Sequence, residues 1–153
     1  MFITALSDTH GNKLAVKSIE KQLNQSCLVL HLGDHFCDVD FLKPTLQDKL
    51  ITVYGNCDGG GEDKIIEKEN IKILITHGDK HGVKMGLTRL YLRAQEIGAR
   101  LVFYGHTHVP RIDAVDGITF VNPGCMTGYS SSKTYAQVEL TDGIVKAKIL
   151  EID

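Results

Sequence analysis

The sequence has no tryptophan, only three prolines and no surplus of either charge, since 17 Lys+Arg stand against 19 Asp+Glu in 153 residues. A net charge of -2 gives no general attraction to nucleic acid or acidic membranes, so a phosphate-bearing ligand must be attracted locally. No apolar run approaches the roughly 20 residues of a membrane span. No basic leader precedes the strand-like start "MFITAL". We therefore expect a cytoplasmic protein with no membrane partner and no strong nucleic-acid signal.

The cysteines are few and scattered. Cys27, Cys37, Cys57 and Cys125 form no C-x-x-C pair, which argues against a thiolate zinc site or a thioredoxin-like motif. A chain of this length buries enough core to need no disulfide framework, so we expect free, buried thiols. Linker-like tracts and internal repeats are also missing, which favours a single domain over residues 1–153.

Short apolar runs alternate with amphipathic stretches in the first part of the chain, as in β-α-β units. We predict strands at 2–7, 27–32, 50–55, 64–68, 71–76 and 99–105. We predict helices at 13–25 (capped by Asn12), at 39–46 (interrupted by Pro44) and at 87–97. Closely spaced strands follow at 111–115, 118–122, 134–140 and 144–150, with Asp-Gly turns typical of hairpins. The pattern predicts an α/β chain with two packed sheets and helices outside them.

Side chains able to bind metal stand directly after five of these predicted strands. They are Asp8 and His10, Asp34, Asn56, His77, and His106 with His108. Ligand sites of open α/β sheets lie outside the carboxyl ends of the strands, so we expect these groups to converge. An extended backbone would also direct both members of each i, i+2 pair, Asp8 with His10 and His106 with His108, to one side.

Each motif alone is more often a turn or a hydrogen-bonded histidine than a metal site. Together they place four of the seven histidines at strand ends beside two aspartates and an asparagine, which favours a metal site. Seven ligands suit two ions that share a carboxylate better than one ion with open positions. Nitrogen and oxygen donors suit Mn, Fe, Co, Ni or Zn and disfavour Ca; Mn is our first expectation.

The motifs resemble those of the calcineurin-like metallophosphoesterases. The family's D-x-H, G-D, G-N-x-[DE], H-G and G-H-x-H appear in that order at 8–10, 33–34, 55–58, 77–78 and 105–108, and "NPGC" at 122–125 is similar to its N-P-G-S turn. The short length and the "GNCD" form look most like the small single-domain phosphodiesterase branch. The resemblance implies an α/β fold, a four-layer α-β-β-α sandwich of two mixed sheets flanked by helices.

The resemblance also implies roles for the seven residues. One ion would be held by Asp8, His10 and His108, the other by Asn56, His77 and His106, with Asp34 as the bridge. A metal-bound hydroxide would attack the phosphorus of a small phosphodiester substrate, with Asp34, Asn56 and His77 in the catalytic set.

Two residues of the third motif bear on the substrate. Cys57 stands where many family members carry a histidine that assists the leaving group, and a thiol is a weaker hydrogen-bond donor. This favours phosphodiesters with good leaving groups, unless Cys57 only packs. Asp58 either orients a ligand or caps its own turn.

Other histidines and functions stay open. His35, Asp79 and His81 receive no role, whereas His31, inside a strand, is expected to be a satisfied core residue. A retromer-complex subunit resembles this family with an incomplete ligand set, so a non-catalytic protein-binding scaffold is the main alternative. A phosphatase or nuclease of the same family, and a homo-oligomer, are also compatible with the sequence.

Overall fold

Two five-stranded sheets form the centre of the molecule, in a computed structural model that describes residues 1–153. The first holds β1 (Phe2–Leu6), β2 (Leu28–His31), β3 (Leu50–Thr52), β9 (Thr134–Thr141) and β10 (Ile144–Glu151), in the order β10-β9-β1-β2-β3. The second holds β4 (Lys64–Lys68), β5 (Ile71–Ile75), β6 (Ala99–Phe103), β7 (Arg111–Val115) and β8 (Ile118–Asn122), in the order β4-β5-β6-β8-β7. Strands β1, β2 and β3 run parallel, as do β5, β6 and β8, and the others join them through antiparallel pairs.

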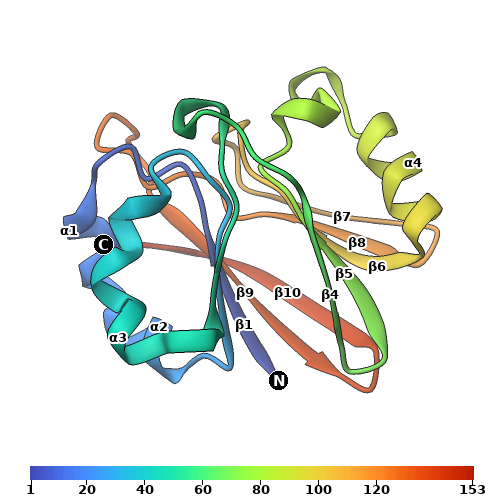
Figure 1. Ribbon diagram of the computed structural model, residues 1–153, viewed down its shortest axis with the longest axis horizontal. Helices are drawn as coiled ribbons and strands as arrows, with labels where there is room; N and C mark the ends of the chain where they lie inside the picture. Colours follow the sequence, from blue (N-terminus) through green and yellow to red (C-terminus); the bar gives the residue numbers. More distant parts are fainter.

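Helices cover the outer faces of both sheets (Figure 1). The α-helices are α1 (Lys13–Ser18), α2 (Glu20–Gln25), α3 (Lys43–Leu46) and α4 (Thr88–Ile97). Short 3-10 helices occur at Phe36–Leu42, Gln47–Lys49, Asn56–Asp58, Asp79–His81 and Val83–Met85. The first three α-helices lie against the first sheet and α4 against the second, so the predicted four-layer sandwich is confirmed. None of the helices combines the length and apolar character of a membrane span.

Three apolar clusters hold these layers together. A cluster of 15 buried residues, among them Ile3, Ile73 and Phe103, fills the space between the sheets. Neighbouring residues of the same strands face the opposite way, so Leu6 packs with the helices of the first sheet and Leu74 lies in the cluster under α4. Since both faces of these strands are buried, they read as continuous apolar runs in the sequence.

The predicted helix at 13–25 is wrong in one respect, because it is divided at Ile19. The amide of Ile19 donates to the carbonyl of Val16, three residues back, at 3.2 Å, and this tighter bond ends the first α-helical segment. Asn12 caps the segment as predicted, since its side chain accepts from the amide of Ala15 at 3.3 Å.

Two other elements also differ from the prediction, one in its type of helix and the other in its length. In place of a helix at 39–46, the chain forms the 3-10 helix Phe36–Leu42 and then α3, with Pro44 in its first turn. Proline has no amide to donate, so it is tolerated at a helix start and not inside a helix. The strand predicted at 50–55 stops at Thr52.

The cysteines are all free, as expected, but three of them are not buried. Only Cys125 is buried. Cys27 lies just before β2, whereas Cys37 and Cys57 lie in 3-10 turns at the surface. Their exposure follows from their positions in connecting segments, which an apolar-run pattern does not resolve.

The placement of α4 can be tested with one substitution at two positions. Leu90 is fully buried under the helix, whereas Leu92 on the same helix is 57% exposed. Urea denaturation should show that Leu90→Ala lowers the free energy of unfolding by about 2 to 4 kcal/mol. The matched control Leu92→Ala should change it by about 0.5 kcal/mol or less. Equal losses would contradict the packing of α4 on the second sheet.

Candidate metal centre

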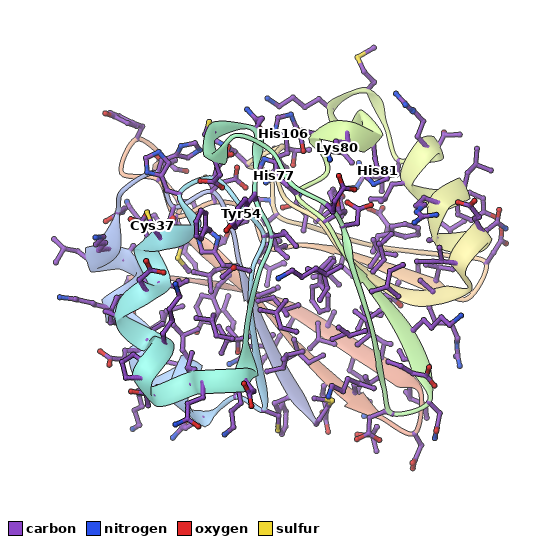
Figure 2. All side chains as sticks on the ribbon, viewed as in Figure 1. Cys37, Tyr54, His77, Lys80, His81 and His106 are labelled. Carbon is purple, nitrogen blue, oxygen red and sulfur yellow. The ribbon has the colours of Figure 1, made fainter.

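The loops after β1, β2, β3, β5 and β6 meet at one edge of the molecule, where the two sheets adjoin. Figure 2 shows His77 and His106 next to each other at this edge. Hydrogen bonds cross from one sheet to the other: the amide of His106 donates to Asp8 Oδ2 at 3.1 Å, and His77 Nδ1 lies 2.7 Å from the carbonyl of Leu32. The convergence expected from strand ends is therefore present in the structure.

One group of donors combines side chains from the loops after β1, β2 and β6. The ligand atoms of Asp8, His10, Asp34 and His108 all lie within 4.8 Å of one another. His108 Nε2 is 3.1 Å from Asp8 Oδ1, and His10 Nε2 is 3.3 Å from His108 Nε2. His10 Nε2 is also 3.6 Å from Asp34 Oδ2. These atoms surround a single point.

A second group adjoins the first through the same aspartate. The ligand atoms of Asp34, His77 and His106 lie within 4.8 Å of one another. His77 Nε2 is 3.2 Å from His106 Nδ1 and 3.5 Å from Asp34 Oδ1. Asn56 Oδ1 lies 3.1 Å from His77 Nε2. One oxygen of Asp34 therefore faces each group.

Two observations test whether these residues fit metal ions. A carbonyl can only accept, so His77 Nδ1 carries the proton that it donates to Leu32, and its Nε2 lone pair faces the second group. Asp8 Oδ1 is buried and receives no hydrogen bond of acceptable geometry, although His108 Nε2 is near. An unpaired buried carboxylate oxygen is costly, and a cation would satisfy it. The nitrogen and oxygen donors fit a divalent transition metal.

The electrostatics keep Asp8 anionic. Burial alone would raise the pKa of Asp8, but the adjacent His108 imidazole and the Ser7 hydroxyl outweigh it and lower that pKa. Contact with Asp8 raises the pKa of His108. Burial, followed by the positive charge of Lys84, lowers the pKa of His106. The site thus presents a fixed negative charge beside imidazoles in two different environments.

The backbone of the site is not extended, so the predicted reason for the paired spacing is wrong. Five donor residues have positive φ: Asp8 at 53°, His10 at 44°, Asp34 at 59°, His106 at 71° and His108 at 61°. The strands end at Leu6 and Phe103, and left-handed turns then aim the side chains. Non-glycine residues are strained in this region and persist only where the surroundings hold them, typically at functional sites.

Glycines allow the loops to approach closely. A Cβ on Gly33 would lie 2.6 Å from the amide nitrogen of Gly55 and 2.7 Å from His77 Nδ1. A Cβ on Gly105 would collide with the Ser7 hydroxyl and lie 2.9 Å from Asp8 Oδ2. Glycine at these two positions therefore avoids a clash that the side chain of any other residue would cause at the strand end.

Asp58 holds the loop that carries Asp34. Its carboxylate accepts hydrogen bonds from the amides of Asp34 at 2.8 Å, His35 at 2.7 Å and Gly55 at 2.9 Å. The bond to Gly55 caps its own turn, and the other two reach the neighbouring loop. The contacts of Asp58 therefore correspond to both alternatives that the sequence left open.

Cys57 is exposed, and a part for it in leaving-group departure stays a prediction. Its amide donates to Asp34 Oδ1 at 2.9 Å, and its sulfur lies 3.7 Å from Asn56 Nδ2. Partial desolvation and then the Asp34 carboxylate raise the pKa of Cys57. The side chain therefore stands beside the second group as a neutral thiol.

His31 is a satisfied core residue, as predicted. It is fully buried, accepts from the amide of Gly33 at Nδ1 (3.2 Å) and has Nε2 3.0 Å from Thr9 Oγ1. The Gly33 amide leaves Nδ1 without a proton, so the ring is neutral and protonated at Nε2. Burial lowers the pKa of His31 to about 4. The ring joins the first donor loop to the second.

The three residues without a predicted role, His35, Asp79 and His81, lie outside both donor groups. The ring of His35 is exposed and its centroid is 5.3 Å from that of His10, so His35 borders the first group. His81 pairs with Asp63 at 2.7 Å, and the structure places neither His81 nor Asp79 in either donor group.

Sequence reasoning gave no role to Asn122, which anchors the last histidine motif. Its Nδ2 donates to the carbonyl of Gly105 at 3.1 Å and to Thr107 Oγ1 at 3.0 Å. Asn122 ends β8, a parallel strand beside β6. The same strand-end rule could have identified it.

Sequence comparisons agree on one family. Residues 1–143 match the family described as the calcineurin-like phosphoesterase superfamily domain. A probable metallophosphoesterase of Bacillus subtilis is 34% identical over 128 residues, which cover 81% of this chain and 74% of that protein. A phosphodiesterase of Methanocaldococcus jannaschii is 29% identical over 150 residues, or 84% of this chain and 86% of that protein.

Solved structures show the same architecture. A predicted phosphoesterase from Streptococcus pneumoniae has a TM-score of 0.81 at 30% identity, over 98% of this chain and 88% of that chain. Vps29 of Entamoeba histolytica, solved with Zn²⁺, has a TM-score of 0.75 at 24% identity, over 99% of both chains. The second likeness shows the shared fold alone.

The buried His31 makes stability depend on pH. Its pKa is about 4 in the folded chain against an ordinary 6.5. The unfolded chain therefore binds more protons between these pH values, and the contribution is complete above 6.5 and lost as pH falls toward 4. Between pH 7 and 5 the loss should be about 2 kcal/mol.

Urea denaturation of the metal-free protein at both pH values would measure this loss. His31→Asn keeps an acceptor for the Gly33 amide but cannot take up a proton, so its stability should fall less than that of the wild type. The control His35→Asn removes an exposed histidine at a left-handed position that asparagine tolerates, and it should keep the wild-type slope. Identical slopes for wild type and His31→Asn would refute the assignment.

Proposed function

The chain belongs to the calcineurin-like phosphoesterase superfamily, and on that premise we propose that it is a phosphodiesterase that uses two divalent metal ions. The observation that carries the proposal is the pair of donor groups on either side of the Asp34 carboxylate. The family supports a hydrolase of phosphate esters, and the relative from Methanocaldococcus jannaschii is itself a phosphodiesterase.

In this proposal each donor group holds one ion. The first ion would be bound by Asp8, His10 and His108, the second by Asn56, His77 and His106, and Asp34 would be shared between them. An anionic carboxylate can bind both ions and screen their repulsion, which a neutral imidazole cannot do. The donor set suits Mn²⁺ first, with Zn²⁺, Ni²⁺, Fe²⁺ and Co²⁺ as alternatives.

Hydrogen bonds within the chain position the donor side chains before any ligand binds. Two such ions, when bound, lower the pKa of a coordinated water and stabilise charge on phosphoryl oxygens. Asp58 fixes the loop of Asp34, and the Leu32 carbonyl fixes the tautomer of His77. Cys57 presents only a weak donor, so a small phosphodiester with a good leaving group is the substrate class that we propose.

A protein-binding scaffold is the competing function. The likeness to Vps29 shows a common fold, and it does not assign a binding partner to this chain. The residues of both donor groups are present here, and the carboxylates of Asp8 and Asp34 accept hydrogen bonds from the amides of His106 and Cys57, an orientation that a purely structural surface does not need. Activity on a phosphodiester separates the two functions.

Metal removal and re-addition test the enzyme directly. After stripping, Mn²⁺, Ni²⁺ or Zn²⁺ should restore cleavage of an aryl phosphodiester such as bis(p-nitrophenyl) phosphate. Asp34→Asn should lower kcat by about a hundredfold or more, because the shared anion is lost. Asparagine is chosen because it tolerates the positive φ of Asp34 better than alanine.

The matched control is Asp142→Asn. Asp142 is exposed in the β9–β10 turn and has a similar φ of 49°, so the same substitution there should leave activity unchanged. Full metal binding without turnover of any phosphoester would support the scaffold.

The thiol at position 57 leads to a separate prediction. Cys57→His should raise the rate on phosphodiesters with poorer leaving groups by about tenfold or more relative to p-nitrophenyl esters, because imidazolium can donate a proton to the departing oxygen. Cys27→His, at an exposed position before β2, is the control. Unchanged relative rates across a leaving-group series would exclude Cys57 from leaving-group departure.

A further inference from the structure

A groove of about 590 Å³ lies beside the candidate metal centre. Its walls come from the turn at residues 83–87, from Thr107 and Val109, and from β7. Two lining residues adjoin the donor motifs: Thr107 stands between His106 and His108, and Val83 packs beside Gly78, where a Cβ would lie 2.9 Å from Val83 Cγ2. The groove therefore borders the metal centre. Small organic ligands occupy sites in this size range.

The floor of the groove is held in place by hydrogen bonds. Thr107 Oγ1 accepts from Asn122 Nδ2 at 3.0 Å and from the amide of Val109 at 3.2 Å. This loop is therefore ordered relative to β8, and a ligand would not have to organise it.

One wall is the outward face of β7. Arg111, Asp113 and Val115 line the groove, whereas Ile112 does not, as expected for alternate residues of a strand. Val115 is 46% exposed, and Val109 on the neighbouring loop is 59% exposed. Val115 pairs with Ile118 at the end of β7 far from the metal centre, whereas Val109 directly follows His108, so Val109 is the uncovered apolar surface that an ester group of a bound phosphate could bury.

The groove also contains one uncommitted cation. Arg111 is held by Asp113, with Nε 2.7 Å from Oδ2 and Nη2 3.0 Å from Oδ1. Lys84 is exposed and makes no ion pair or side-chain hydrogen bond. Lys84 lines the groove together with Thr107, the residue between His106 and His108. Its ammonium group is therefore available to an anion at the edge of the metal centre.

We propose that this groove binds an apolar ester group, of aryl size, of the phosphodiester substrate, and that Lys84 pairs with an unesterified phosphoryl oxygen. This inference rests on the proposed function, because the metal centre fixes where the phosphate lies. A substrate with small polar ester groups would leave the valine surface exposed. A polyanionic substrate would find only one free cation.

Two non-chromogenic probes with the same anionic group test the groove by binding alone. Isothermal titration of the Mn²⁺-loaded protein should give diphenyl phosphate about tenfold or more higher affinity than dimethyl phosphate. Val109→Thr, which keeps the β-branched shape beside His108, should weaken binding of diphenyl phosphate severalfold and leave dimethyl phosphate unchanged. Lys84→Gln should weaken both probes severalfold.

Each variant has a control nearby. Ile112→Thr lies on the opposite face of β7, and Lys80→Gln removes a lysine that is already paired with Glu62 at 3.3 Å; neither should change the affinity of either probe. Equal affinity for the two probes, or wild-type affinities in Val109→Thr and Lys84→Gln, would overturn the inference.

The outcomes separate this inference from the proposed function. If the probes bind in the expected pattern but no phosphodiester is hydrolysed, the groove stands and the enzyme is refuted. If aryl phosphodiesters are hydrolysed but the two probes bind equally, the enzyme stands and the groove is refuted.

Discussion

The carboxylate of Asp34 is the point on which the candidate site depends, because its two oxygens face different groups of donors. One oxygen lies 3.6 Å from His10 Nε2, and the other lies 3.5 Å from His77 Nε2. His10 follows a strand of the first sheet and His77 a strand of the second. The apolar cluster between the sheets therefore sets the separation of the two donor groups. A change in core packing would change the distance between them.

Hydrogen bonds around this carboxylate hold the donor loops in a strained backbone conformation. Asp58 binds the amides of Asp34 and His35, and the buried ring of His31 joins the loops of Thr9 and Gly33. Left-handed backbone at five donor residues is costly in isolation, at about 1 to 3 kcal/mol each. A site that kept this strain without a ligand to bind would gain nothing from it. The strain, the orphaned oxygen of Asp8 and the fixed tautomer of His77 all favour bound cations.

Much of the fold and the gathering of the site followed from the sequence, for a simple reason. Strands buried on both faces are continuous apolar runs, and polar residues directly after them lie at one edge of the sheets. The local conformation did not follow: a local hydrogen bond from Ile19 to Val16 divides the helix, and the left-handed backbone of His106 accompanies a hydrogen bond from its amide to Asp8. The groove between residues 83–87 and β7 joins segments that no sequence pattern links. The sequence offered Asp58 as an orienting or capping residue, but the amides of Asp34 and His35 that it binds are set by the approach of two loops.

The most direct test of the account is an anomalous diffraction experiment on crystals soaked in Mn²⁺. It should show two peaks per chain about 3.5 to 4 Å apart, one on each side of Asp34, with His10 and His108 at one ion and His77 and His106 at the other. A single peak, or a pair in which Asp34 contacts only one ion, would contradict the claim that this carboxylate joins two metal sites.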